Sequence, residues 1–213
     1  MAIIESLEID PTQGAVIGSY RAPEVGDSGG YYRSTLLSGT MTSIAANGMF
    51  YAFRNPSSNL VLVHNVSVGF RAVAGGAVPI SQIVSMYVTR SYTVLDTTGA
   101  ATALSYKGQL LAQTKTSQMN SIQRISNTGA LSGGTGTDDA QPINSLIFTH
   151  RGTVSSPGNY PMFQQNPGGL VMPSYPLVLD ANEGFRLRFL TAMLAANTMV
   201  AFVDVEWLEC SAF

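Results

Sequence analysis

Hydrophobic and polar residues alternate along several short stretches of this sequence, a period of two that is typical of β-strands. In residues 60–73, LVLVHNVSVGFRAV, Val66, Val68 and Phe70 fall on one side and Arg71 on the other. Comparable stretches rich in β-branched and aromatic residues occupy residues 34–44, 49–55, 80–95 and 145–151. Turn residues follow these stretches, and no amphipathic helical period of useful length appears, so the pattern predicts an all-β chain.

Turn residues also divide the chain into an arm and one domain. For 213 residues with about eight short strands, we expect a single antiparallel β-sandwich that is jelly-roll-like. Residues 34–213 form this domain. Residues 1–33 are interrupted by Gly and Pro and keep no sustained period, which predicts an extended N-terminal arm. The turn dipeptide Asn47-Gly48 predicts a hairpin after residues 34–44.

The last two apolar stretches, in residues 185–209, are separated by the sequence AAN and predict a second hairpin. A three-residue loop at this point sets the register and places the aromatic residues on one face, with Phe185 opposite Trp207. This face is almost wholly apolar, so we expect it to fill the interior of the sandwich.

The other face of this predicted hairpin carries two opposite-charge pairs and an apolar end. The register places Arg186 opposite Glu206 and Arg188 opposite Asp204. Such pairs contribute about 0.2–1 kcal/mol each. Nearer the turn, the face carries three apolar residues that need a cover, namely Leu190, Val200 and Phe202. Two covers are possible: the loops or arm of the same chain, and an interface with another subunit.

Charge and composition narrow the range of functions. Charged residues make up 11% of the chain, against roughly 25% in an average protein, so the surface is largely uncharged or is buried against other chains. A formal net charge of −2 provides no basic field for nucleic acid. The N-terminus lacks the basic region of a signal peptide, and no stretch is long enough to cross a membrane. We therefore expect a soluble protein made in a cytoplasm.

Residues with catalytic or metal-binding chemistry are sparse. Cys210 is the single cysteine, and the two histidines, His64 and His150, lie far apart in the sequence. We therefore predict no disulfide, no metal site and no cofactor. No G-x-S-x-G motif or readable pair of carboxylates is present, so we predict no catalytic residues and expect a protein that is not an enzyme. The Gly-rich residues 127–139 are interpreted as a loop.

Four aromatic residues in predicted loop or arm segments support an alternative function. They are Tyr31, Tyr32, Tyr160 and Phe163. Aromatic rings with one apolar face and a polar tip are suited to stacking on sugars. The alternative is therefore a glycan- or receptor-binding module that uses these rings as contacts.

The sequence also resembles a known class of proteins. The stretches FYAFRNPSSNLVLVHNVSVGFRAV and EGFRLRFLTAMLAANTMVAFVDVEWLE, joined by a middle rich in Gly, Ser and Thr, resemble small jelly-roll virion proteins of tailed bacteriophages. The likeness is to capsid decoration, or cement, proteins in particular. It covers residues 48–73 and 184–209, about a quarter of the chain. Similar sandwiches occur in phage fibres and tails, where the alternative glycan- or receptor-binding module would belong.

This resemblance implies a position and partners for the protein. It implies a homotrimer on the exterior of the capsid, in which each subunit bridges neighbouring copies of the major capsid protein. The N-terminal arm, residues 1–33, is expected to reach a neighbouring subunit or the capsid. Such a protein would stabilise the shell because it binds the assembled state more tightly than separate capsid subunits.

Overall fold

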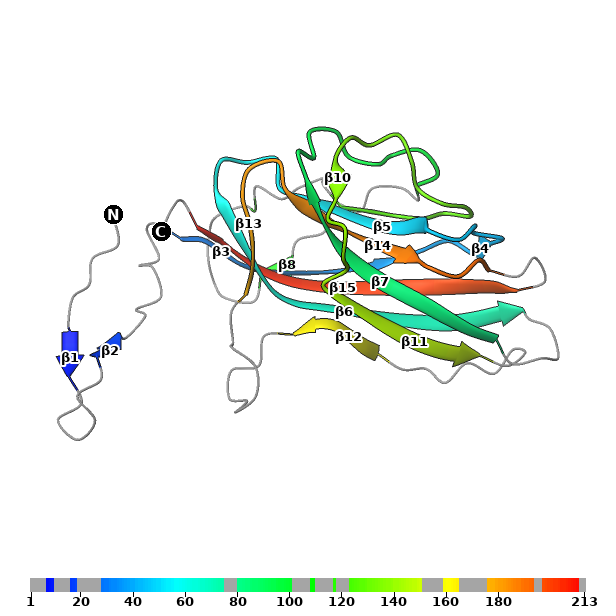
Figure 1. Cartoon of the computed structure of the whole chain (residues 1–213), viewed down its shortest axis with the longest axis horizontal. Helices are drawn as coiled ribbons and strands as arrows, with labels where there is room; N and C mark the ends of the chain where they lie inside the picture. Colours follow the sequence, from blue (N-terminus) through cyan, green and yellow to red (C-terminus); the bar gives the residue numbers. More distant parts are fainter. Residues whose placement is uncertain are drawn as a thin grey trace.

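The computed structural model of this chain describes residues 7–9, 16–18, 28–74, 80–100, 108–109, 117, 123–150, 159–164, 176–193 and 197–210. Every regular element in these ranges is a β-strand, and every strand pairing is antiparallel. From Ser28 onward the strands form two sheets that pack face to face (Figure 1). The predicted antiparallel β-sandwich is therefore confirmed.

The first sheet, called sheet I, has the strand order β12-β6-β15-β3-β8, with β13 also paired to β6 and β4 to β15. Its strands are β3 (Ser28–Leu37), β4 (Met41–Thr42), β6 (Leu60–Ala74), β8 (Gly108–Gln109), β12 (Asn159–Gln164), β13 (Leu177–Leu179) and β15 (Thr198–Cys210). The longest strands, β6 and β15, lie side by side at its centre. Pro161 lies in β12, at one edge of this order, where a missing backbone donor interrupts no inner ladder.

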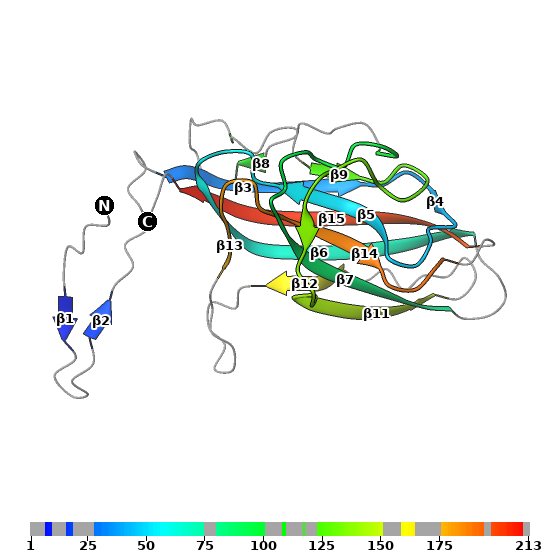
Figure 2. The same ribbon diagram turned by 45° about the horizontal axis from the view of Figure 1, so that its top comes forward.

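The second sheet, called sheet II, has the order β10-β7-β14-β5-β9, with β11 also paired to β7. Its strands are β5 (Gly48–Arg54), β7 (Ile80–Arg90), β9 (Gln123–Ile125), β10 (Thr137–Asp138), β11 (Asn144–His150) and β14 (Gly184–Phe189). The short strands β1 (Leu7–Ile9) and β2 (Val16–Gly18) pair only with each other in the strand order. They stand clear of both sheets in two views (Figures 1 and 2).

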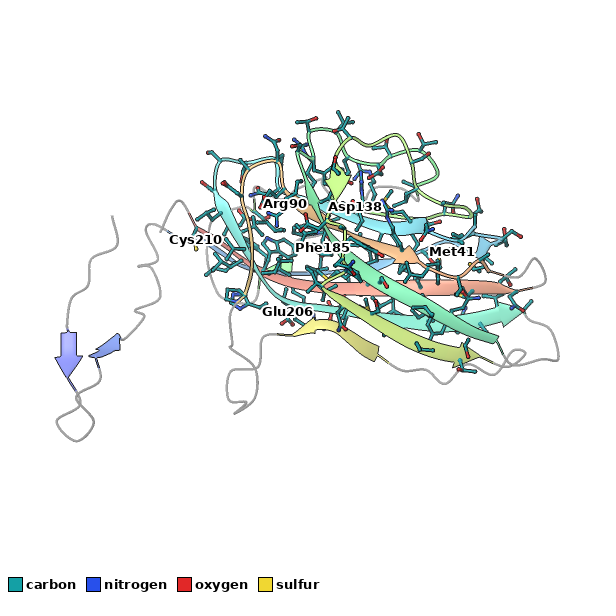
Figure 3. All side chains as sticks on the ribbon, viewed as in Figure 1. Met41, Arg90, Asp138, Phe185, Glu206 and Cys210 are labelled. Carbon is teal, nitrogen blue, oxygen red and sulfur yellow. The ribbon has the colours of Figure 1, made fainter. Side chains whose placement is uncertain are left out.

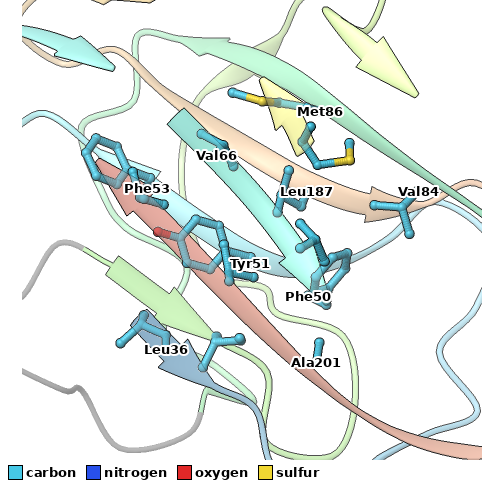
Figure 4. Packing of buried hydrophobic residues seen from close by; sticks show 14 of the residues in the cluster. Leu36, Phe50, Tyr51, Phe53, Val66, Val84, Met86, Leu187 and Ala201 are labelled. Carbon is cyan, nitrogen blue, oxygen red and sulfur yellow. The ribbon is translucent and has the colours of Figure 1, made fainter. Parts of the chain in front are cut away.

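Aromatic side chains from both sheets meet in the interior. Phe53 of sheet II lies against Trp207 of sheet I, with ring centroids 5.8 Å apart, and Phe70 stacks on Phe148 at 4.1 Å. Aliphatic residues and methionines fill the remaining space (Figure 4). Along β15, alternate side chains from Met199 to Trp207 face this core, which is the arrangement that the period-two pattern predicts.

A smaller apolar cluster lies outside the sandwich interior. It consists of Met49, Ala52, Tyr92, Leu95 and Leu131. Ala52 pairs with Arg186 of β14, at a position between the inward-facing Tyr51 and Phe53. Met49 also lies on β5, whereas Tyr92, Leu95 and Leu131 come from the segments at residues 91–100 and 126–136, which therefore pack on the outer face of sheet II. Residues 127–139, interpreted as a loop, belong partly to this cover.

The predicted terminal hairpin is wrong, although its apolar face was identified correctly. Phe185, Phe189 and Trp207 are fully buried. However, β14 pairs with β5 and β7, whereas β15 pairs with β3, β4 and β6, so the two strands lie in different sheets. Alternation shows which side chains face a core but not which strands pair, because both sheets cover the same core. Two of the three residues of the AAN loop lie outside the described residues.

Two smaller expectations also change. The turn at Asn47 is present, with a positive φ of 62°, but the chain passes there from β4 in sheet I to β5 in sheet II instead of forming a hairpin. Sheet I also extends into residues 1–33, the range expected to be an arm, because β3 begins at Ser28. The alternation through Tyr32, Ser34 and Leu36, all buried, explains this.

Tyr32 provides a test of the core at this end of the sandwich. Burial first, and then the nearby charge of Glu209, raise the pKa of Tyr32 to about 12. Folding therefore favours the neutral phenol over the tyrosinate. In the unfolded chain the pKa of Tyr32 is near 10, so the stabilisation is complete below pH 10 and is lost as the pH rises through about 12. After a rapid jump in pH, we expect the tyrosinate absorbance of the folded protein, minus that of Tyr32→Phe, to titrate near pH 12. A difference curve with a midpoint near pH 10 would contradict the buried position.

Candidate interaction surface

The outer face of sheet I is the surface on which two of the three predicted interface residues, Val200 and Phe202, meet. Along β15, Met199, Ala201 and Val203 are buried in the core, and the alternate positions Val200 and Phe202 are half-buried. Phe202 pairs with Leu37 of β3 on one side and with Gly69 of β6 on the other. The outer face of this sheet is therefore apolar where β3, β15 and β6 lie side by side around Phe202.

Two strongly exposed residues extend this apolar area. Leu37 is 59% exposed and Val73, on β6, is 41% exposed. Together with Val200 and Phe202 they form what we call the outer patch. Large apolar side chains this accessible, grouped over three adjacent strands, are typical of a surface that another protein covers.

Gly69 keeps the ring of Phe202 against the sheet. A Cβ atom added to Gly69 would lie 1.7 Å from Cζ of Phe202 and 2.3 Å from both Cε atoms. The ring therefore occupies the space directly above the glycine backbone, where no other residue type leaves room. As a result, the outer patch has a flat aromatic centre.

A charged row borders the outer patch along β15. Asp204 accepts a hydrogen bond of 2.9 Å at Oδ1 from Nε of Arg33, and another of 2.9 Å from the hydroxyl of Thr35. The second guanidinium nitrogen of Arg33 bridges to Oδ2 of Asp204, and Nε lies 3.7 Å from Glu206. The predicted pairs of Asp204 and Glu206 with Arg188 and Arg186 are therefore wrong, because these arginines belong to the other sheet.

Arg71 lies at the opposite side of the patch. It pairs with Val200 in the ladder between β6 and β15, and its side chain is exposed. It forms no ion pair with any residue that the structure describes. The patch is thus bordered by an available cation on β6 and by two carboxylates that share Arg33 on β15.

Arg186 and Arg188 instead hold the cover on the outer face of sheet II. Arg186 is 4% exposed. Its Nε donates to Asp96 at 3.0 Å, its Nη1 donates to Asp138 at 3.0 Å, and its Nη2 donates to the carbonyl of Thr135 at 3.0 Å. Arg188 also bridges to Asp138. Asp138 and Glu206 lie on opposite outer sides of the sandwich, with Phe185 between the sheets (Figure 3).

Tyr92 completes this buried charge cluster. Its hydroxyl donates to Oδ2 of Asp96 at 2.5 Å, and the Arg186 guanidinium lies 4.5 Å from its ring centroid. Burial, followed by the bond to Asp96, raises the pKa of Tyr92 above its usual range. For Arg186, burial acts to lower the pKa, but Tyr92 and Asp96 outweigh it and the net pKa is raised. Arg186 therefore stays charged and fixes the loops at residues 91–100 and 133–139.

The structure separates some of the other predicted site residues. Leu190, whose backbone N–H donates to Ile83 of sheet II, follows β14 and does not join Val200 and Phe202. Tyr32 is 1% exposed and stacks on Trp207, so it cannot stack on a sugar. The other three candidate glycan contacts lie on strands instead of loops, and their side chains are outside what the structure describes; they are Tyr31, Tyr160 and Phe163.

Sequence reasoning missed Leu37, Val73 and Arg33. A signal for two of them was present, since the alternation through Tyr32, Ser34 and Leu36 places Arg33 and Leu37 on the outer face. Among the described residues, no group of three His, Cys, Asp or Glu side chains is placed to hold a metal ion. In the same part of the chain, no helix meets the length and hydropathy that crossing a membrane requires.

Comparison with known proteins adds no assignment. No protein-family model matches this sequence, and a search of curated proteins finds no match.

Proposed function

We propose that this chain is a structural virion protein that binds the outside of a phage capsid as an oligomer. In this role it bridges subunits of the major capsid protein and stabilises the shell. The proposal takes the oligomer to be a trimer, as the sequence resemblance implies, and the protein to be made in the host cytoplasm before it joins the virion.

The observation that carries the proposal is the outer patch. Leu37 and Val73 are 59% and 41% exposed beside the half-buried Val200 and Phe202. The charged groups around them are in ion pairs or on the border, so the patch offers shape and apolar area, with no reactive group at its centre. These properties favour binding to another protein surface, which is the central requirement of a subunit that assembles.

The strand order supports the more specific proposal that the sandwich is a jelly roll. Within the described residues, the strands of six residues or more are, in chain order, β3, β5, β6, β7, β11, β12, β14 and β15. Numbered from one to eight, they give the orders 1-8-3-6 in sheet I and 2-7-4-5 in sheet II. Successive strands thus alternate between the sheets over most of the chain, as in a double-sheet jelly roll.

Oligomerisation and capsid binding are linked physically in this proposal. An oligomer that contacts several capsid subunits binds with a higher effective concentration than a monomer does. Its binding energy stabilises the shell only when it favours the assembled capsid over separated subunits. A subunit that can no longer oligomerise should therefore also bind the capsid more weakly.

Phe202→Asp tests the proposal. The substitution places a carboxylate at the centre of the outer patch, where association would remove it from water. The mass in solution should therefore shift from oligomer to monomer, while the circular dichroism spectrum remains that of a β-protein. Virions assembled with this variant should carry less of the protein and should lose DNA at a lower temperature than wild-type virions. Mass is measured by light scattering, and occupancy by cryo-EM.

Ile147→Asp is the matched control, because Ile147 is 66% exposed but lies on β11 of sheet II. It should leave both the mass and the virion occupancy unchanged. An oligomer that persists in Phe202→Asp, or virions whose heat resistance is indifferent to the loss of this protein, would refute the proposal.

A further inference from the structure

Charges of opposite sign flank the outer patch on the two sides of Phe202. Arg71 of β6 pairs with Val200, two residues before Phe202 along β15. Asp204 and Glu206 follow Phe202 by two and four residues, on the same outer face of this strand. At about 3.4 Å per residue, the cation is displaced about 7 Å along the strand to one side of Phe202, and the two carboxylates about 7 and 14 Å to the other.

The acidic side carries more negative than positive charge. Arg33 bridges to both Asp204 and Glu206, so two carboxylates share one guanidinium. Glu206 is the more accessible of the two, because its side chain is 22% exposed and that of Asp204 is 5% exposed. A cation that approaches this end of the patch from outside is therefore attracted to Glu206.

Arg71 cannot be that cation within its own chain. The row of Arg71 lies six residues from Glu206 along β15, a separation of about 20 Å that the two side chains cannot bridge. Arg71 is exposed and forms no ion pair with a described residue. The cation on one side of the patch thus matches the carboxylates on the other side of a second copy.

We infer that three copies associate through the outer patch, with Phe202 at the threefold axis and Arg71 of each copy against Glu206 of the next. The axis crosses the strands along the row that joins Leu37, Phe202 and Gly69. In a closed ring, one side of each subunit meets the other side of its neighbour, so the two sides must be complementary. The inference rests on the proposed function, whose trimer it requires, and it specifies the surface and the ion pair.

The apolar centre and the charged sides have different tasks in this contact. Leu37, Val73, Val200 and Phe202 supply the apolar area that association removes from water. The flat position of the Phe202 ring on the sheet lets three copies approach closely at the axis. The opposite charges lie at the rim, where they mainly set the orientation of the copies and disfavour other arrangements.

Charge reversal tests the ion pair. Arg71→Glu should raise the concentration at which half of the protein is assembled about three- to tenfold, because it turns attraction into repulsion at every junction. Arg71→Glu/Glu206→Arg restores opposite charges at each junction and should recover most of the loss. The matched control is Arg90→Glu, since Arg90 is 50% exposed but lies on β7 of sheet II, and it should change nothing. Sedimentation velocity measures the assembly.

Cross-linking tests the position of the axis. Leu37 is exposed and pairs with Phe202, so the proposed symmetry brings three copies of this position together. Leu37→Cys treated with a trivalent maleimide should give a covalent trimer on a denaturing gel. Native Cys210 is buried and should not compete. Ile147→Cys, exposed on sheet II, should give at least several-fold less covalent trimer.

The outcomes separate this inference from the proposed function. A wild-type protein that is monomeric by light scattering refutes self-association and, with it, both proposals. A dimeric wild-type protein overturns the threefold arrangement, because a two-fold contact over Phe202 would match the same charges. A trimer that is indifferent to Arg71→Glu, is not rescued by the double reversal, or gives no covalent trimer from Leu37→Cys also overturns the inference. In these last cases Phe202→Asp and the virion measurements still decide the proposed function.

Discussion

Replacing Arg186 with methionine is expected to lower the free energy of unfolding by about 3–5 kcal/mol, because it leaves the buried carboxylate of Asp96 without its counter-charge. Asp96 is 2% exposed and receives its strongest charge-assisted contact from this guanidinium. Asp138 retains Arg188, but the carbonyl of Thr135 loses its donor. The loss should appear in urea unfolding at neutral pH as a lower midpoint.

Arg90→Met is the control for this result. The Arg90 side chain is 50% exposed, and it pairs with Asp139 and Glu183 close to the same cover. Solvent screens such pairs, so we expect a loss of less than about 1 kcal/mol. The Arg186→Met/Asp96→Asn double variant should recover part of the deficit, because it removes the carboxylate charge that Arg186→Met leaves unpaired. Equal losses for Arg186→Met and Arg90→Met would contradict the burial of the cluster.

Phe185→Ala should also cost about 3–5 kcal/mol of stability, the range for truncating a buried aromatic side chain. Phe185 is fully buried, stacks on Phe53 at 4.9 Å and lies 5.8 Å from the ring of Tyr51. Its removal leaves a cavity between the sheets that rigid neighbouring strands cannot close. Unfolding in guanidinium, followed by tryptophan fluorescence from Trp207, measures the change.

Phe202→Ala makes the same chemical change on the outer face. Because Phe202 is only half-buried and covers Gly69, we expect a loss of about 1 kcal/mol. The solution mass should respond more strongly than the stability does, since the outer patch loses its aromatic centre. A larger loss of stability for Phe202→Ala than for Phe185→Ala would mean that the two faces of the sandwich are assigned the wrong way round.

The terminal strands show how far alternation can be used. It correctly assigned Phe185, Phe189 and Trp207 to the core, because burial of every second side chain depends only on the strand itself. Pairing depends on partners elsewhere in the chain. Two strands that face each other across a core have the same alternation as two strands that are hydrogen-bonded, so the sequence pattern could not distinguish the hairpin from the observed crossing between sheets.

The charged residues illustrate the same limit at longer range. Arg186 finds Asp96 and Asp138 at separations of 90 and 48 residues, and Arg33 finds Asp204 at 171. No local spacing encodes such partners. The outer patch could be predicted in part from the sequence, because Val200 and Phe202 were expected to be surface residues that require a cover. Leu190 was grouped with them only because the hairpin register was wrong.

The position of β15 has a consequence for synthesis of the protein. It lies between β3 and β6 and pairs with both, yet it follows both in the chain. While the ribosome is still translating the preceding segments, these two strands can only face each other across an empty strand position, with their backbone edges unpaired. These unpaired edges can pair with other chains until β15 emerges and forms its ladders with both strands.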